Sequence, residues 1–168
     1  MILFTAVMSF LIIQRLVELS ISSRNVRAML KEGGIEYGKE HYKYIVVMHS
    51  LFIISMLTEY LLRDHYGKLN DISYLFLVFF IFLQAMRVWV ITSLGKFWST
   101  RIIRVPGSEL VKKGPYKFLK HPNYLVVSLE IFCLPMIFGL YYTAAIFTIL
   151  NALILYMRIK EENKALKI

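Results

Sequence analysis

The residues best suited to chemistry lie in one polar stretch, from Ser108 to Tyr124, which is set between long apolar runs. The stretch contains a Gly-Pro turn, a cluster of lysines and the sequence His121-Pro-Asn-Tyr124. Polar, irregular backbone at a membrane is tolerated where it is buried in protein or lines a cavity. We therefore interpret this stretch as the wall of a cofactor pocket at the membrane surface.

The sequence His121-Pro122 predicts the start of a helix. Proline suits the first helical turn because it lacks an N–H group, and it disfavours helical geometry in the residue before it. Free N–H groups near Asn123 and Tyr124 would then form a site for a carboxylate or a phosphate. The alternative is that His-Pro-Asn is only an interfacial helix cap.

Aromatic residues accompany this helix start. Tyr116, Phe118 and Tyr124 lie in the stretch, and Trp98 precedes it. Their ring faces suit a bound cation or an adenine ring. A sulfonium cofactor with an amino-acid carboxylate would use both the rings and the helix start, whereas an aromatic belt at the membrane interface is the structural alternative.

A second pair of chemically capable residues, Arg158 and Glu162, lies near the end of the sequence. They are four residues apart and so share one helix face. Considered alone, they favour an exposed ion pair worth about 0.3 to 0.5 kcal/mol. A tight hairpin would bring them back beside His121 and Tyr124, where the arginine fork suits an acceptor carboxylate or another acidic oxygen.

Five apolar runs must position these residues, and most approach the roughly 20 residues that a spanning helix requires. They cover approximately residues 2–19, 44–62, 72–94, 123–138 and 140–157. Pro135 and Gly139 lie near the junction of the last two runs, which predicts a tight helical hairpin that need not cross the bilayer at full depth. We predict an all-α polytopic membrane protein of about five transmembrane helices, with residues 1–168 forming a single domain. Residues 1–94 would be its scaffold, and residues 95–168 would carry a cytoplasmic cofactor-binding loop, the hairpin and a catalytic tail.

Composition and charge agree with a membrane protein. The chain has 168 residues, of which 58% are hydrophobic, and its net charge is +9. The basic residues occupy short segments between apolar runs, so they indicate membrane orientation and not binding to nucleic acid. Three segments are rich in basic residues: the loop after the first run, the loop after the third run and the tail. They contain Arg24, Arg27, Lys31, Lys39 and Lys43; Lys96, Arg101, Arg104, Lys112, Lys113, Lys117 and Lys120; and Arg158, Lys160, Lys164 and Lys167. The loop between the second and third runs has only Arg63 and Lys68. This pattern predicts an integral protein of the cell membrane with the N-terminus outside and the polar loop and tail in the cytoplasm. The first run is predicted to be a retained span and not a signal peptide.

Ionisable residues also occur inside the runs, where they usually face a partner or a cavity. Arg87 lies in the third run with Gln84 one turn earlier, and Glu59 and Glu130 come from the second and fourth runs. One interpretation is that Arg87 pairs with one of these acids and locks the bundle. The other is that these residues share in the pocket of the acceptor.

Two further polar segments are interpreted as structural. Gln14, Arg15 and Glu18 recur at helical spacing, which predicts an interfacial polar face with Arg15 reaching toward water. The glycine-rich segment 31–38 is predicted to be a connector between the first two helices, with a lid over the site as the alternative.

The sequence does not contain the motifs that several other kinds of site require. The four histidines have neither metal-ligand spacing nor cysteine companions, so no metal is expected. A Rossmann domain is not expected either, because no Gly-x-Gly-x-x-Gly sequence is present. Cys133 is the single cysteine and lies in an apolar run, where packing is its expected role.

Four spaced motifs carry a resemblance to a known family. They are Leu94-Gly-Lys-Phe-Trp98, Leu110-Val-Lys-Lys-Gly-Pro-Tyr116, Lys120-His-Pro-Asn-Tyr124 and Arg158-Ile-Lys-Glu-Glu162. Together they make residues 84–166 similar to the isoprenylcysteine carboxyl methyltransferase family of integral membrane enzymes. The resemblance implies S-adenosylmethionine as the methyl donor, a helical membrane fold without a Rossmann domain, and methylation of a lipid-like acceptor that enters from the bilayer.

The resemblance also implies roles for single residues. Its cofactor positions fall on Ser108, Glu109, Leu110, Val111, Tyr116, His121, Pro122, Asn123 and Tyr124. Its acceptor and catalytic positions fall on Arg158 and Glu162. The chain departs from the family pattern at Lys120, where arginine is usual, at Val126, where a small residue is frequent, and in its shorter N-terminal part. These departures bear on the identity of the acceptor more than on the identity of the cofactor.

The acceptor and the reaction class are open at this stage. A prenylcysteine carboxylate is the family default, but a long-chain lipid with an acidic enol or phenol hydroxyl also fits, and it would need Glu162 or His121 as a base. One rival function is an NADPH-dependent membrane reductase of the sterol-reductase kind, which has a similar His-Pro-Asn-Tyr helix start. The Arg-x-x-Glu-Glu ending and the small size disfavour it. The other rival is a non-catalytic membrane protein whose polar groups only lock the bundle.

Overall fold

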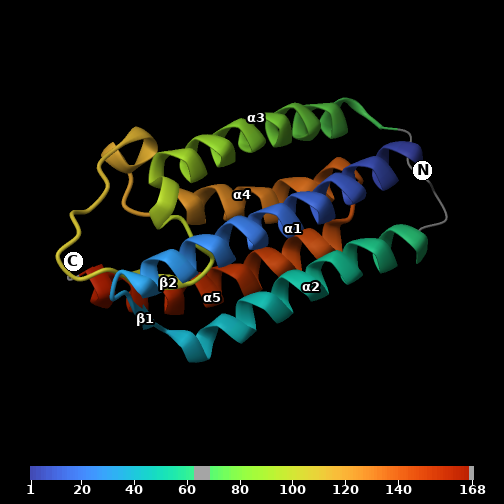
Figure 1. Ribbon diagram of the computed structural model, residues 1–168. Coiled ribbons are helices and arrows are strands. Elements are labelled where there is room, and N and C mark those ends of the chain that lie inside the picture. Colours follow the sequence, from blue (N-terminus) through green and yellow to red (C-terminus); the bar gives the residue numbers. More distant parts are fainter. Residues whose placement is uncertain (63–68, 167–168) are drawn as a thin grey trace.

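Long helices form a bundle, and loops with a small ribbon cover one end of it in the computed structural model, which describes residues 1–62 and 69–166 (Figure 1). The helices of the described residues are α1 (Ile2–Lys31), α2 (Lys39–Leu62), α3 (Asp71–Leu94), α4 (Pro122–Ile137) and α5 (Tyr141–Leu166). The predicted all-α polytopic fold is confirmed. Arg63, Lys68 and Lys167, which entered the charge argument, lie outside the described residues.

Four of the helices, α1, α2, α3 and α5, are long and apolar enough to cross a membrane. Large apolar side chains such as Leu16, Ile54 and Leu75 are exposed on their surfaces, as expected where the surrounding solvent is lipid. The remaining helix, α4, has 16 residues and is shorter than a full span. The chain is therefore an integral membrane protein in which one helix stops short of the usual length.

The predicted hairpin between α4 and α5 is confirmed. Pro135 lies in the last turn of α4, and Gly139 adopts a φ of 65°, a backbone conformation that favours glycine. The N–H of Leu140 donates back to the carbonyl of Pro135 at 2.9 Å, which closes the turn. Two residues after Gly139, α5 begins and returns along α4 toward the loop end of the bundle (Figure 1).

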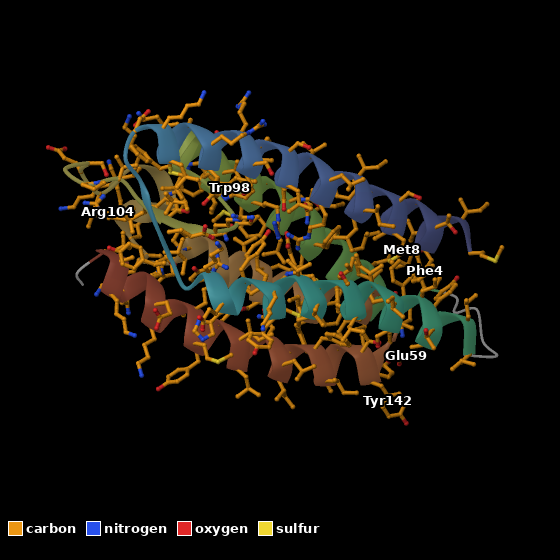
Figure 2. All side chains as sticks on the ribbon, turned by 60° about the horizontal axis from the view of Figure 1, so that its bottom comes forward. Phe4, Met8, Glu59, Trp98, Arg104 and Tyr142 are labelled. Atoms are coloured by element: carbon orange, nitrogen blue, oxygen red, sulfur yellow. The ribbon has the colours of Figure 1, made fainter. Side chains whose placement is uncertain are left out.

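Glu59 of α2 caps the start of α5. Its carboxylate accepts the N–H groups of Thr143 at 2.8 Å and Tyr142 at 3.3 Å, and Figure 2 shows Glu59 beside Tyr142 at the end of the bundle. Such a carboxylate satisfies N–H groups that have no helical partner and favours the positive end of the helix dipole. The role of Glu59 is thus to fix the hairpin, far from the loop end.

A cluster of paired charges joins α1, α3 and α4 inside the bundle. Arg87 is 2% exposed, and its Nε donates to Glu130 Oε1 at 2.8 Å. Its Nη1 donates to the two carboxylate oxygens of Glu18 at 2.9 and 3.0 Å. Gln84 adds a hydrogen bond of 3.0 Å to Glu130, and Arg15 adds an ion pair of 3.0 Å to Glu18. The predicted pairing of Arg87 with an acid of the bundle is confirmed.

The prediction of an interfacial polar face on the first helix is wrong for Glu18. Its side chain is buried, at 5% exposure, and faces Arg87 across the bundle. Helical spacing correctly placed Gln14, Arg15 and Glu18 together, and Gln14 donates to Glu18 at 3.1 Å. The direction in which that face points depends on a partner on α3, 69 positions away from Glu18 along the chain.

A two-stranded ribbon joins two loops at the loop end of the bundle. β1 (Ile35–Tyr37) pairs antiparallel with β2 (Ile102–Arg104), with Glu36 opposite Ile103. The glycine-rich segment is thus the predicted connector between α1 and α2, but it is also bonded to the loop that follows α3. Short 3-10 turns, η1 (Gly95–Phe97) and η2 (Gly114–Lys117), complete this layer.

Candidate active site

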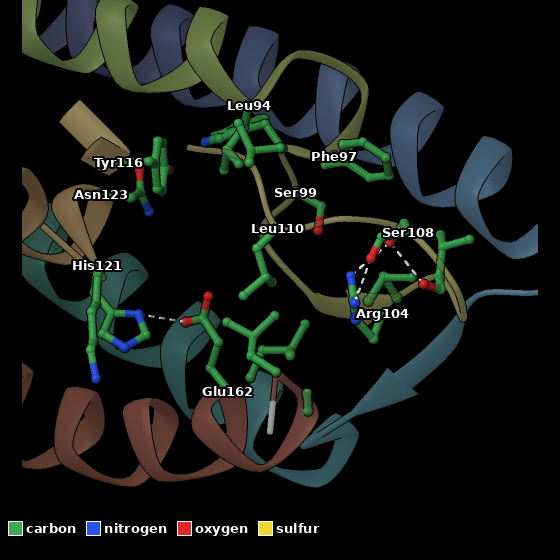
Figure 3. A pocket seen from close by; sticks show the side chains of 18 of the residues that line it. Leu94, Phe97, Ser99, Arg104, Ser108, Leu110, Tyr116, His121, Asn123 and Glu162 are labelled. Carbon is green, nitrogen blue, oxygen red and sulfur yellow. Dashed lines mark hydrogen bonds and ion pairs between the residues drawn. The ribbon is translucent and has the colours of Figure 1, made fainter. Parts of the chain in front are cut away.

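A cavity of about 350 Å³ lies at the loop end of the bundle (Figure 3). Residues from three parts of the chain line it, within the ranges 94–105, 108–124 and 158–166. Small-molecule sites usually measure about 300 to 1,000 Å³. The cavity therefore has the size for a compact cofactor. Its walls include both parts of the predicted site, the polar stretch and the residues near the end of the chain.

Most of the residues predicted for the site line this one cavity. They are Ser108, Glu109, Leu110, Val111, Tyr116, His121, Asn123, Tyr124, Arg158 and Glu162. The exception is Pro122, which is fully buried at the first position of α4 and does not line the cavity. The structure thus brings the two halves together, while the binding of a cofactor and an acceptor by these residues stays a prediction.

The start of α4 differs from expectation in one respect. Pro122 occupies the first helical position, as predicted, and the preceding His121 lies outside helical geometry with φ −130° and ψ 59°. The N–H of Tyr124 donates to the carbonyl of His121 at 3.1 Å, so the prediction that it is free was wrong. A tight first turn satisfies such a group within the chain, and the helix start offers less to an anion than the sequence indicated.

Tyr124 links Arg158 to Glu162. Arg158 Nε donates to the Tyr124 hydroxyl at 2.8 Å, and that hydroxyl donates to Glu162. Arg158 Nη2 donates to the carbonyl of Thr100 at 2.6 Å. No direct ion pair joins Arg158 to Glu162, both of which lie in the described part of the chain, so the phenol holds them in one network in place of the expected pair.

His121 lies between two acceptors. Its Nδ1 is 3.3 Å from Glu162 Oε2, and its Nε2 is 3.0 Å from Asn163 Oδ1. Figure 3 marks the contact between His121 and Glu162. A ring with an acceptor at each nitrogen is best matched by the doubly protonated form. The hydrogen bond to Glu162 raises the pKa of His121 above its usual value, against the opposing effect of burial.

We expect His121 to titrate above the ordinary histidine pKa of about 6.5. Because the folded pKa is raised, the stabilising contact with Glu162 is fully present below about 6.5 and is lost as the pH rises through the folded value. NMR titration of protein labelled in its histidine rings measures the midpoint, and a His121→Gln variant identifies the signal. Glu162→Gln should lower the midpoint toward 6.5. A wild-type midpoint at or below 6.5 contradicts the assignment.

The predicted aromatic residues divide into two groups. Tyr116, Tyr124 and Trp98 line the cavity, and burial raises the pKa of the Tyr116 phenol, which keeps it neutral. Phe118 does not line the cavity, and 80% of it is exposed. The expectation that Phe118 offers a face to the ligand is therefore wrong, because the short turn before it points its ring outward.

Sequence reasoning missed the wall formed by residues 99–105. Arg104 lies in β2 and donates to the hydroxyl and the carbonyl of Ser108, each at 2.6 Å (Figure 3). These bonds fold the start of the predicted stretch against the ribbon. The segment Arg101-Ile-Ile-Arg104 is too short to show the alternation of a strand, so the sequence carried no clear signal for it.

α1 contributes to the site through residues that the sequence did not single out. Ser22 accepts the N–H of Thr100 at 2.9 Å. Asn25 donates to the carbonyls of Gly95 at 3.0 Å and Trp98 at 2.8 Å. Since the carbonyl of Thr100 holds Arg158, α1 fixes the segment that orients this arginine.

The fold and the cavity define an integral membrane protein whose helical bundle carries a cavity of small-molecule size at one end. The model of the isoprenylcysteine carboxyl methyltransferase family matches residues 76–168, a range that contains every residue predicted for the site. This is more than half of the chain, and the chain belongs to this family of membrane methyltransferases. The resemblance found in the four motifs is thus confirmed.

Two relatives match over most of their length. The chain is 43% identical over 165 residues to the uncharacterized protein YpbQ of Bacillus subtilis, covering 98% of this chain and 97% of the relative. It is 30% identical over 158 residues to an uncharacterized protein of Haemophilus influenzae, covering 90% of this chain and 88% of the relative. The comparison with solved structures gave no match.

Proposed function

We propose that the protein transfers a methyl group from S-adenosylmethionine to an acidic oxygen of a lipid-like acceptor. The observation that carries the proposal is the shared cavity of the polar stretch 108–124 with Arg158 and Glu162. The first part suits a methyl donor, and the second suits an anionic oxygen. Membership of a methyltransferase family supports the reaction class.

The cavity fits the proposed donor in size and in chemistry. The carboxylate of Glu109 suits its ammonium group, Lys112 and Lys120 suit its carboxylate, and the ring of Tyr116 suits its adenine or its sulfonium. When bound, the sulfonium supplies an electrophilic methyl group. We assign its binding to Ser108, Glu109, Leu110, Val111, Tyr116, His121, Asn123 and Tyr124, with Pro122 as support.

Arg158 is the group that we assign to the acceptor. Its Nε and Nη2 are held by Tyr124 and Thr100, whereas its Nη1 has no partner among the described residues. It can therefore donate to an acceptor oxygen without losing the contacts that orient it. A carboxylate acceptor is already ionised and needs no base, so positioning and the exclusion of water provide the catalysis.

An enol or phenol acceptor would have to lose its proton. Glu162 is then the candidate base, because its carboxylate lies in the cavity wall. Against the effect of burial, the hydrogen bonds from His121 and Tyr124 lower the pKa of Glu162, so an acceptor hydroxyl that it deprotonates has to be acidic. His121 is a poorer candidate, since its contacts with Glu162 and Asn163 favour the form that is already protonated. The acceptor class thus decides whether Glu162 acts as a base or only positions Tyr124.

We further propose that the cavity and the C-terminus face the cytoplasm and that the acceptor reaches the cavity from the bilayer. Arg101, Arg104, Lys112 and Lys120 all line the cavity, so this end of the bundle is basic. Basic residues collect on the cytoplasmic side of membrane proteins. S-adenosylmethionine would then enter from water, and the cell membrane is the expected location.

Transfer of labelled methyl groups tests the proposal. Detergent-purified protein is incubated with methyl-labelled S-adenosylmethionine and with prenylated thiols, prenylcysteines, alkyl phenols or pyrones, and the lipid extract is counted. We expect label in at least one acceptor class and none with heat-denatured protein. Binding of NADPH without binding of S-adenosylmethionine would favour the reductase, and binding of neither would favour a non-catalytic role.

A further inference from the structure

The segment Lys112–Lys120, here called the lysine turn, has two unlike faces. Pro115 is buried and Tyr116 lines the cavity, so the inner face belongs to the site. On the outer side, Phe118 is 80% exposed, and Lys113 and Lys117 are also exposed. An aromatic ring that contacts so little protein has no role in packing the bundle.

The depth of the lysine turn follows from its contact with α3. A Cβ atom added to Gly114 would lie 2.2 Å from Ser93 Oγ and 2.9 Å from Trp89 Nε1. Trp89 precedes the end of α3 by five residues, which is roughly 7.5 Å at 1.5 Å per residue. The turn therefore lies beside the last turns of a spanning helix and not beyond its end. The last turns of a helix that crosses a bilayer are expected at the interface, where tryptophans such as the exposed Trp89 are common.

The charge of the turn has one sign. Lys112, Lys113, Lys117 and Lys120 fall within nine residues, and neither aspartate nor glutamate occurs between Leu110 and Leu129. Phe118, which is 80% exposed, lies among these lysines and does not line the cavity. Exposed apolar side chains among lysines are typical of segments that lie in the interface of an anionic membrane. If the turn faced water alone, the apolar ring of Phe118 would be left in contact with water.

We propose that the lysine turn is a membrane-binding element that places Phe118 in the bilayer interface and Lys113 and Lys117 on anionic lipid headgroups. The partner is the anionic lipid of the leaflet that surrounds the loop end of the bundle. The inference rests on depth, exposure and charge, and it does not depend on which reaction the cavity catalyses. A pocket wall is thereby attached to the membrane surface.

Site-directed spin labelling tests the position of Phe118. Cys133 is the only cysteine of the chain and is fully buried, so a nitroxide can be attached selectively to a Phe118→Cys variant. Lys31→Cys, at the exposed end of α1, is the matched control. In nanodiscs that contain phosphatidylglycerol, we expect a several-fold lower collision rate with a water-soluble nickel chelate at position 118 than at position 31. Equal rates at the two positions would overturn the proposal.

The role of charge is tested by comparing lipids. The nickel collision rate at position 118 should be lower with phosphatidylglycerol than with phosphatidylcholine alone. Adding Lys113→Gln and Lys117→Gln should remove this difference, and neither lysine lines the cavity. A difference that persists in that variant, or one that is absent from the Phe118→Cys protein, would reject the anionic lipid as partner. Neither readout needs methyl transfer, so failure here is separate from failure of the proposed function.

Discussion

Replacing Arg158 with alanine should reduce methyl transfer by at least about 10²-fold, the usual loss when a group that stabilises transition-state charge is removed. The guanidinium is oriented by Tyr124 and Thr100, and its remaining N–H groups are available to an acceptor oxygen. Binding of the cofactor product S-adenosylhomocysteine should stay close to the wild-type value, because the polar stretch 108–124 remains. Labelled methyl transfer measures the first quantity, and isothermal titration calorimetry measures the second.

Two further variants make this result specific. Arg158→Lys keeps the charge but loses the fork that contacts Tyr124 and Thr100 together, so we expect it to recover little activity. Lys160→Ala removes a positive charge from an exposed position two residues away on α5 and should retain wild-type turnover. Near-wild-type turnover of Arg158→Ala would contradict the assignment of Arg158 to the acceptor site.

The second large effect concerns stability and lies away from the cavity. Replacing Arg87 with methionine should cost about 3 to 5 kcal/mol, because it leaves Glu18 and Glu130 buried without their main partner. The thermal unfolding midpoint in detergent should fall accordingly. Arg87 does not line the cavity, so protein that remains folded should still bind S-adenosylhomocysteine.

Removal of the whole cluster is the control for this prediction. In a variant with Arg15→Met, Glu18→Gln, Arg87→Met and Glu130→Gln, no unpaired charge remains among these four positions. Replacing a complete buried ion network is often neutral or stabilising, whereas breaking it is costly. We therefore expect this variant to regain much of the midpoint that Arg87→Met loses. If Arg87→Met unfolds at the wild-type temperature, the cluster does not stabilise the bundle.

The sequence by itself determined the helices and the membrane class. An apolar run of about 20 residues directly reflects the thickness of a bilayer, so composition and length suffice to predict a span. It also determined local events that a few residues control, such as the start of α4 at Pro122 and the turn at Pro135 and Gly139. Because that turn is short, the return of Arg158 and Glu162 to the start of α4 followed from sequence as well.

Only the tertiary structure decided how these parts meet. Helical spacing predicted that Gln14, Arg15 and Glu18 share a face, but the partner of Glu18 is Arg87, 69 positions away. The same limit applies to the pairing of β1 with β2 and to the contact of Ser22 with Thr100, 78 positions apart. Local sequence encodes which residues share a face, whereas the direction of that face depends on what packs against it.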